Sequence, residues 1–152
     1  MKKSAALLIV IILAILQVTI LNHLRIFSVK PDLLLIAVVL TALSLELKQA
    51  LFFSILAGIF KDIFSINAFG VNTVLFPIWS FLIIKLSKEV SIEDNPAFAV
   101  LVFITVVFND IAARLINLTL GNFIPLGIFL RVAFLESLYT ALVSSLAFRF
   151  IR

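Results

Sequence analysis

Long apolar runs separated by short polar connections make up most of this sequence. The first run, residues 4–24, is 21 residues long and carries no charge, which is enough to cross a hydrocarbon core of about 30 Å. Five further apolar stretches follow it. The pattern predicts an all-α integral membrane protein built as a bundle of six transmembrane helices. The predicted spans are 4–24, 31–47, 49–65, 71–86, 96–118 and 126–149.

Composition supports a membrane protein and excludes several other classes. The chain is 64% hydrophobic and 13% charged, whereas soluble domains are about 25% charged. We expect a single domain, 1–152, because no polar segment remains that could form a second one. The sequence has no cysteine and His23 is its only histidine, so we expect no metal centre and no cofactor. The basic residues form no stripe, which argues against a nucleic-acid partner.

The distribution of basic residues predicts the orientation in the membrane. Six spans place both termini on the same side, and the side richer in lysine and arginine is normally cytoplasmic. One side would hold seven basic residues: Lys2, Lys3, Lys48, Lys85, Lys88, Arg149 and Arg152. The other side would hold only Arg25 and Lys30. We therefore predict that both termini are cytoplasmic (N-in/C-in).

The stretch 58–70 places a carboxylate inside an apolar span. Ser54, Gly58, Asp62 and Ser65 fall on one stripe of a helix, at i, i+4, i+8 and i+11. A charge in such a segment costs roughly 3 kcal/mol or more unless it faces protein, water or a counter-ion. Asp62 should therefore point into the bundle beside small residues that let another helix approach closely.

Asp110, Arg114, Arg131 and Glu136 are further ionisable residues within the predicted spans. Asp110 and Arg114 are four residues apart with the acid first, which favours an intrahelical ion pair. A rise of about 1.5 Å per residue places Asp110, Asp62 and Arg131 at a similar level in the outer half, with Glu136 nearer the midplane. The sequence thus predicts a charged layer, with Arg131 as the partner of Asp62. Such a layer would either hold the bundle together or bind a partner.

Two weaker patterns concern helix packing. The segments Phe-Lys-Asp-Ile at 60–63 and Phe-Asn-Asp-Ile at 108–111 are 48 residues apart, which suggests two halves of three helices, although chance similarity explains them as well. In the last span, small residues recur every four positions and form a seam suited to close helix contact. The seam consists of Ala133, Ser137, Ala141 and Ser145.

Three motifs together resemble the MreD family of rod shape-determining membrane proteins. They are Lys30-Pro31-Asp32 before a leucine-rich span, Gly58-x3-Asp62-x2-Ser65-x4-Gly70, and Val107-x2-Asp110-Ile111. The resemblance extends along nearly the whole chain. The chain departs from the family at Ile66, where glycine is frequent, and in the last span, which lacks a proline that many members have.

The resemblance implies a non-catalytic scaffold in the bacterial inner membrane. Its expected partner is MreC, a periplasmic protein with a single transmembrane span. MreB and the cell-wall glycosyltransferase and transpeptidase complex are expected to act with it, so the protein would support rod shape and peptidoglycan synthesis in the elongasome. The candidate structural or partner-binding residues are Pro31, Asp32, Gly58, Asp62, Ser65, Gly70, Asp110, Arg114, Arg131 and Glu136. We expect Asp62→Leu to weaken association with such a partner more than it weakens folding.

Two other functions compete with this one. The size and span number are similar to those of the substrate-binding S components of energy-coupling factor transporters, although the Ala-x3-Ala docking signature of their first helix is absent. In that case Asp62, Asp110 and Arg131 would line a small-molecule pocket. An intramembrane aspartyl protease needs two acids that share a proton. Lys61 and Arg114, near those acids, would favour the ionised form of both and argue against a protease.

Overall fold

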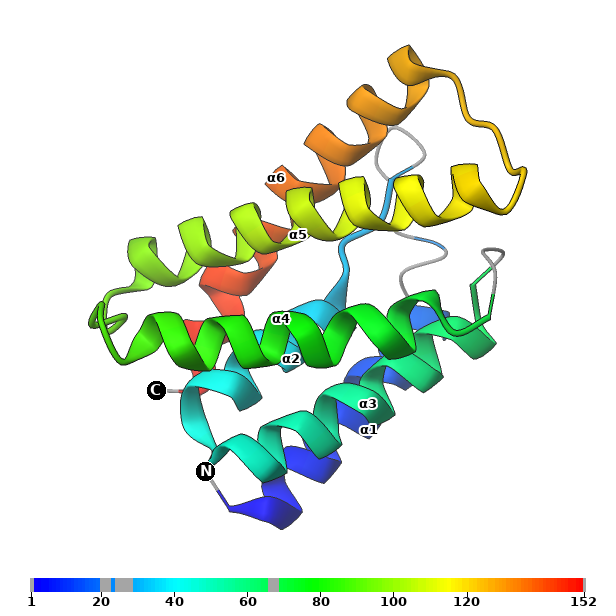
Figure 1. Ribbon diagram of the computed structural model, residues 1–152. Helices are drawn as coiled ribbons and strands as arrows, with labels where there is room; N and C mark the ends of the chain where they lie inside the picture. The colour runs from blue at the N-terminus through cyan, green and yellow to red at the C-terminus, as the bar shows by residue number, and fades with distance from the viewer. Residues whose placement is uncertain (1, 20–22, 24–28, 66–68, 152) are drawn as a thin grey trace.

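The computed structural model describes residues 2–19, 23, 29–65 and 69–151, and this part of the chain forms six helices (Figure 1). The helices are α1 (Lys3–Thr19), α2 (Leu33–Ser44), α3 (Leu47–Ile63), α4 (Val71–Ser87), α5 (Asn95–Thr119) and α6 (Leu126–Ile151). Each corresponds to one predicted span. The predicted end of the first span, at residue 24, falls outside the described residues. By length and composition, α5 and α6 are the helices that could cross a membrane unaided, while the apolar helices α1, α2 and α4 are shorter.

Successive helices run in opposite directions, so their connections alternate between the two ends of the molecule. One end gathers the starts of α1, α3 and α5 and the ends of α2, α4 and α6, and both chain termini lie there (Figure 1). We call it the basic end, because it holds the basic residues that were predicted to share one side. Those described are Lys2, Lys3, Lys48, Lys85, Lys88 and Arg149.

Helix α2 is the centre of the fold. Residues 33–42 are all buried, as expected for a helix that is hydrophobic all round. The prediction for this span, 31–47, was too long at both ends. With 12 residues, α2 is about 18 Å long and begins in the interior of the molecule rather than at its surface. Val29 and Pro31, in the non-helical chain before it, are also buried, which is how non-helical backbone is tolerated at membrane depth.

The helices group as four and two. Helices α1–α4 pack against one another around α2, whereas α5 and α6 pack mainly against each other and reach the rest through α2 and α4. The predicted division into two halves of three does not match this arrangement. The reason is that α4 packs most extensively on α3 and so completes the first unit instead of opening a second.

Gly58 allows the close contact between α3 and α4. A Cβ atom at this position would lie 2.6 Å from the Asn72 carbonyl oxygen and 2.7 Å from Thr73 Cα. Both are backbone atoms, so they cannot move aside as a flexible side chain could. Within the small-residue stripe, Gly58 is therefore the position at which α4 approaches α3 closely enough to exclude a side chain. Gly70, which immediately precedes α4, has a φ of 100°, a conformation that other residues rarely adopt.

Candidate functional site

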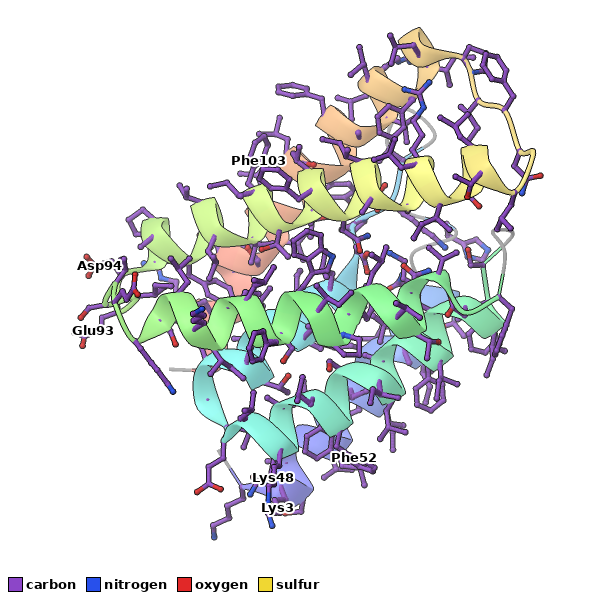
Figure 2. The ribbon with its side chains drawn as sticks, in the orientation of Figure 1. Lys3, Lys48, Phe52, Glu93, Asp94 and Phe103 are labelled. Atoms are coloured by element: carbon purple, nitrogen blue, oxygen red, sulfur yellow. The ribbon has the colours of Figure 1, made fainter. Side chains whose placement is uncertain are left out.

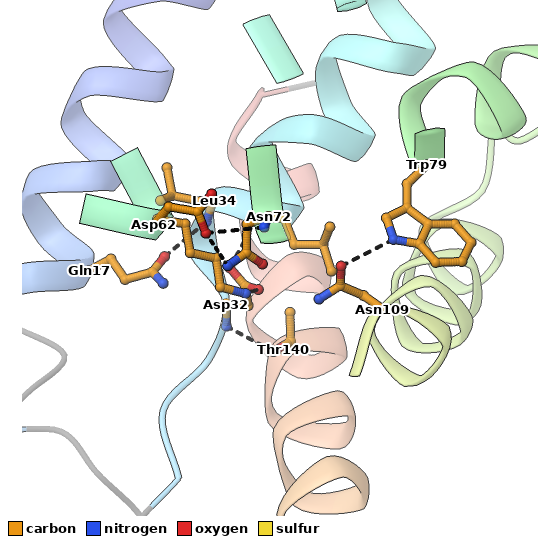
Figure 3. Close-up of polar contacts among 10 residues, drawn as sticks. Gln17, Asp32, Leu34, Asp62, Asn72, Trp79, Asn109 and Thr140 are labelled. Carbon is orange, nitrogen blue, oxygen red and sulfur yellow. Dashed lines mark hydrogen bonds and ion pairs between the residues drawn. The ribbon is translucent and has the colours of Figure 1, made fainter. Parts of the chain in front are cut away.

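Asp62 caps the start of α4. Its Oδ2 accepts hydrogen bonds from the backbone N–H groups of Gly70 (3.0 Å) and Thr73 (2.9 Å) and from Thr73 Oγ1 (2.6 Å). Its Oδ1 accepts from the backbone N–H (3.1 Å) and side-chain amide (2.9 Å) of Asn72 (Figure 3). The first N–H groups of a helix lack intrahelical partners, and an anion is favourable there. Asp62 thus does point into the bundle, where it joins the end of α3 to the start of α4.

The predicted pairing of Asp62 with Arg131 is wrong. Arg131 is exposed on α6, and within the described residues α6 does not pack against α3. Both carboxylate oxygens of Asp62 are instead used by the start of α4. Because these bonds support the fold itself, we now expect Asp62→Leu to act first on folding, which reverses the expectation from sequence. Ser65 is half-buried just beyond α3, and its backbone N–H contacts the Asp62 carbonyl oxygen at 3.4 Å.

A second acid, Asp32, forms a buried ion pair with Lys61. Asp32 is the N-cap of α2, and its Oδ1 accepts a hydrogen bond from the Leu35 backbone N–H at 3.1 Å. Its Oδ2 forms a salt bridge with Lys61 Nζ from α3, and the two side chains are 1% and 17% exposed. The ammonium group also lies 5.3 Å from the centre of the Phe76 ring on α4, which is within cation–π range.

The sequence analysis missed this ion pair, although the sequence contains a signal for it. Asp32 lies 14 residues before Glu46 and Lys61 lies 15 residues after it. Glu46 is in the tight connection between α2 and α3, so equal distances along the two antiparallel helices reach the same depth.

The start of α2 is also held by side chains from two other helices. The backbone N–H of Asp32 donates to Thr140 Oγ1 on α6 at 3.0 Å, and that of Leu34 donates to Gln17 Oε1 on α1 at 3.0 Å (Figure 3). Both bonds are buried. Helices α1, α3 and α6 therefore meet at the first turn of α2, deep in the molecule.

Asp110 of α5 and Glu136 of α6 lie close enough to Asp32 and Lys61 to interact with them electrostatically. We call these four residues, of which Asp32 is buried and the other three are half-buried, the charge cluster. It contains three carboxylic acids and one lysine, and Lys30 lies near Glu136. The Oδ2 atom of Asp110 is buried and has no hydrogen-bond partner among the described residues. The cluster sits where the hairpin of α5 and α6 meets the other four helices.

The predicted ion pair between Asp110 and Arg114 does not form between these two described residues. Arg114 instead donates a hydrogen bond from one of its terminal nitrogens to the Ile124 carbonyl oxygen at 3.2 Å. Its guanidinium carbon lies 4.6 Å from the centre of the Phe129 ring. The Arg114 side chain therefore lies against the connection between α5 and α6. Asp110 has no ion pair with Arg114 and lies in the charge cluster instead.

Of the residues in the predicted charged layer, Asp110 and Glu136 lie in one cluster. Asp32, a candidate through its Lys-Pro-Asp motif, belongs to the same cluster, as does Lys61, which was not among the candidates. A further polar contact, from Trp79 Nε1 to Asn109 Oδ1 at 3.1 Å, links α4 to α5 beside it (Figure 3). Within the described residues, no group of three or more acids or histidines is arranged to hold a metal ion.

Comparison with known proteins supports the family suggested by the sequence. A family model described as rod shape-determining protein MreD matches residues 1–150, which is essentially the whole chain. No curated protein and no solved structure matches the chain.

Proposed function

The chain belongs to the MreD family of rod shape-determining proteins, and from this premise we propose that it is a non-catalytic membrane scaffold of the bacterial elongation machinery. In this role it binds the single transmembrane helix of MreC and so links MreB to the cell-wall glycosyltransferase and transpeptidase complex. It lies in the inner membrane with both termini in the cytoplasm. The grouping of lysine and arginine at the basic end supports this orientation.

The observation that carries the proposal is the exposed apolar surface of the α5 and α6 hairpin. Only 28% and 22% of the most apolar segments of these two helices are buried. On α6, large apolar side chains recur every four residues with 43–62% exposure, and such a row forms a ridge that fits the groove of another helix. We call this row the α6 ridge; it consists of Leu130, Phe134, Leu138, Leu142 and Leu146.

The small-residue seam of α6 lies on the inner side of the same helix. Ala133, Ser137 and Ala141 are buried, and α6 packs there against α5 and α2. The seam therefore provides close helix contact, as expected from sequence, but within the protein itself. A partner helix is left with the α6 ridge, where association in a membrane depends on van der Waals packing.

Co-purification with MreC tests the proposal. The ridge variant, Phe134→Ala/Leu138→Ala/Leu142→Ala, should lower the MreC recovered by about tenfold, because truncating a few central contacts removes most of the binding energy of an interface. The matched control is Leu8→Ala/Ile12→Ala/Ile15→Ala on α1, whose side chains are similarly exposed. It should recover as much MreC as the wild type. Equal recovery with the ridge variant would contradict the ridge as the binding surface.

The cellular role is tested by depletion in the host. Rod-shaped cells should become round on depletion, and the wild-type chain should restore their shape whereas the ridge variant should not. Unchanged shape together with a new nutrient requirement would contradict a role in morphogenesis and favour uptake.

A substrate-binding subunit of a small-molecule importer is the second candidate. The observation that favours it is the buried Oδ2 of Asp110, which has no hydrogen-bond partner in the described part of the chain and lies near Glu136. Asp62 and Arg131, the other residues first considered for such a pocket, do not lie together. Equilibrium binding of a panel of vitamins and cations to the purified protein tests this function. Binding that Asp110→Asn abolishes would support it, and no binding across the panel would contradict it.

A further inference from the structure

A groove lies between the starts of α1 and α3 at the basic end. It has a volume of about 390 Å³ and is lined by Lys3, Ser4 and Leu7 from α1 and by Gln49, Phe52 and Phe53 from α3. Leu7 and Phe52 are exposed and Phe53 is buried. Lys3, Ser4 and Gln49 contribute almost no polar surface to the groove, so its surface is almost entirely apolar.

The rim of this groove is positively charged. Lys3 and Lys48 extend from the adjacent helix starts (Figure 2), and both are exposed, as is Lys2. One acidic residue, Glu46, lies nearby, just before α3. Together with Lys2, Lys3 and Lys48 it gives these two helix starts a local charge of +2. The N-terminal ends of both helices add partial positive charge through their free N–H groups.

We propose that this groove binds an anionic phospholipid. The phosphate group lies between Lys3 and Lys48, beside the opening of the groove. One acyl chain follows Leu7 and Phe52 toward the interior of the membrane. An amphiphile with one negative head group and apolar chains matches both the charge and the lining of the groove, and basic pockets between transmembrane helices bind such head groups. The proposal does not depend on the proposed scaffold function.

Lipid retention tests the proposal. The full chain is placed in nanodiscs with equal amounts of phosphatidylglycerol and phosphatidylcholine, extracted in mild detergent, and analysed by native mass spectrometry. The wild type should retain phosphatidylglycerol preferentially. Lys3→Gln/Lys48→Gln should lower its affinity about 30-fold, since each lysine near an anionic head group contributes about fivefold. Lys3→Arg/Lys48→Arg should preserve the preference because it keeps both charges.

The control variant is Lys85→Gln/Lys88→Gln, which removes two exposed lysines from the same end of the molecule, one in the last turn of α4 and one just after it. It should retain phosphatidylglycerol as the wild type does. Equal loss in the control would show a general charge effect and would overturn the site. So would equal retention of the two lipids by the wild type.

The apolar part of the groove is tested separately. Phe52→Ala should reduce phosphatidylglycerol retention severalfold without changing the lysines, because the acyl chain loses contact with an exposed ring. Inorganic phosphate at millimolar concentration should not displace the lipid. Displacement by phosphate together with no effect of Phe52→Ala would identify a simple anion site and would contradict lipid binding.

Discussion

The four-helix unit α1–α4 and the hairpin of α5 and α6 differ in how completely their surfaces are used. In the first unit α2 is buried on all sides, and Gly58 allows α3 and α4 to pack in close contact. Both carboxylate oxygens of Asp62 accept hydrogen bonds from the start of α4. The hairpin leaves most of its apolar surface exposed and presents an acid with an unpartnered oxygen. Gly58, Asp62 and Gly70, three of the residues on which the resemblance to the family rests, thus build the fold, while the hairpin has surface left for partners.

Gly58→Leu should have the largest effect, because the new side chain would collide with the backbone at Asn72 and Thr73. We expect a loss of more than about 3 kcal/mol and little folded protein, measured as monodisperse yield and thermal unfolding in detergent. Gly127→Leu on α6 is the control, since no atom lies within 4 Å of the Cβ position there. A wild-type unfolding temperature for Gly58→Leu would show that α3 and α4 do not pack this closely.

Lys61→Met should lower the free energy of unfolding by about 3 kcal/mol, because it leaves Asp32 buried without its counter-ion. Asp32→Asn in the same chain should restore most of the loss, since the amide oxygen can still cap α2 at Leu35. Unfolding in sodium dodecyl sulfate measures the four states of this double-mutant cycle. Additive losses in the double variant would mean that the two side chains do not interact.

Asp62→Leu should cost about 2 kcal/mol, because three backbone N–H groups at the start of α4 lose their acceptor. Glu46→Leu is the matched control. Glu46 also precedes a helix but its side chain makes no capping hydrogen bond, so we expect a change within about 0.5 kcal/mol. Asp62→Leu should leave MreC binding per folded molecule unchanged. A loss of binding without a loss of stability would show that Asp62 contributes to the partner interface, as expected from the sequence.

Asp110→Asn should have the smallest effect, within about 0.5 kcal/mol or slightly stabilising, because it removes a carboxylate that has an unpartnered oxygen near other acids. Its neighbour provides the contrast. Asn109→Leu should destabilise by about 1 kcal/mol, because Trp79 Nε1 loses its acceptor. A larger loss for Asp110→Asn than for Asn109→Leu, by equilibrium unfolding, would show that Asp110 supports the fold as the four-helix residues do.

Much of the fold could be predicted from the sequence, because apolar runs of sufficient length indicate helices without knowledge of their neighbours. The inward direction of Asp62 was also predictable, since an acid in an apolar helix seeks protein or water. The partner predicted for Asp62 was wrong, because Arg131 was chosen for its similar depth along a helix. The residues that bind Asp62 lie instead in or just beyond the turn that follows it. Gly70, Asn72 and Thr73 follow Asp62 closely in sequence and offered a helix start that needed an acceptor.

The candidate site was less predictable, since it depends on how helices distant in sequence are placed. The Asp32 and Lys61 pair could have been found by measuring both positions from Glu46. By contrast, the approach of Asp110 and Glu136 to that pair depends on the register between α5 and α6 and on the angle at which the hairpin meets α2. Neither is set by local residue patterns, because apolar contacts in a membrane bundle have little direction of their own.

The first turn of α2 has a consequence for the order in which the protein is assembled. Its amide at Asp32 is satisfied by Thr140, which is synthesised more than a hundred residues later. A nascent chain that has inserted only its first four helices therefore keeps a polar group unsatisfied in an apolar interior, a state that is unfavourable by a few kcal/mol. The final helix supplies the missing acceptor, so α2 is fully held only in a chain that includes α6.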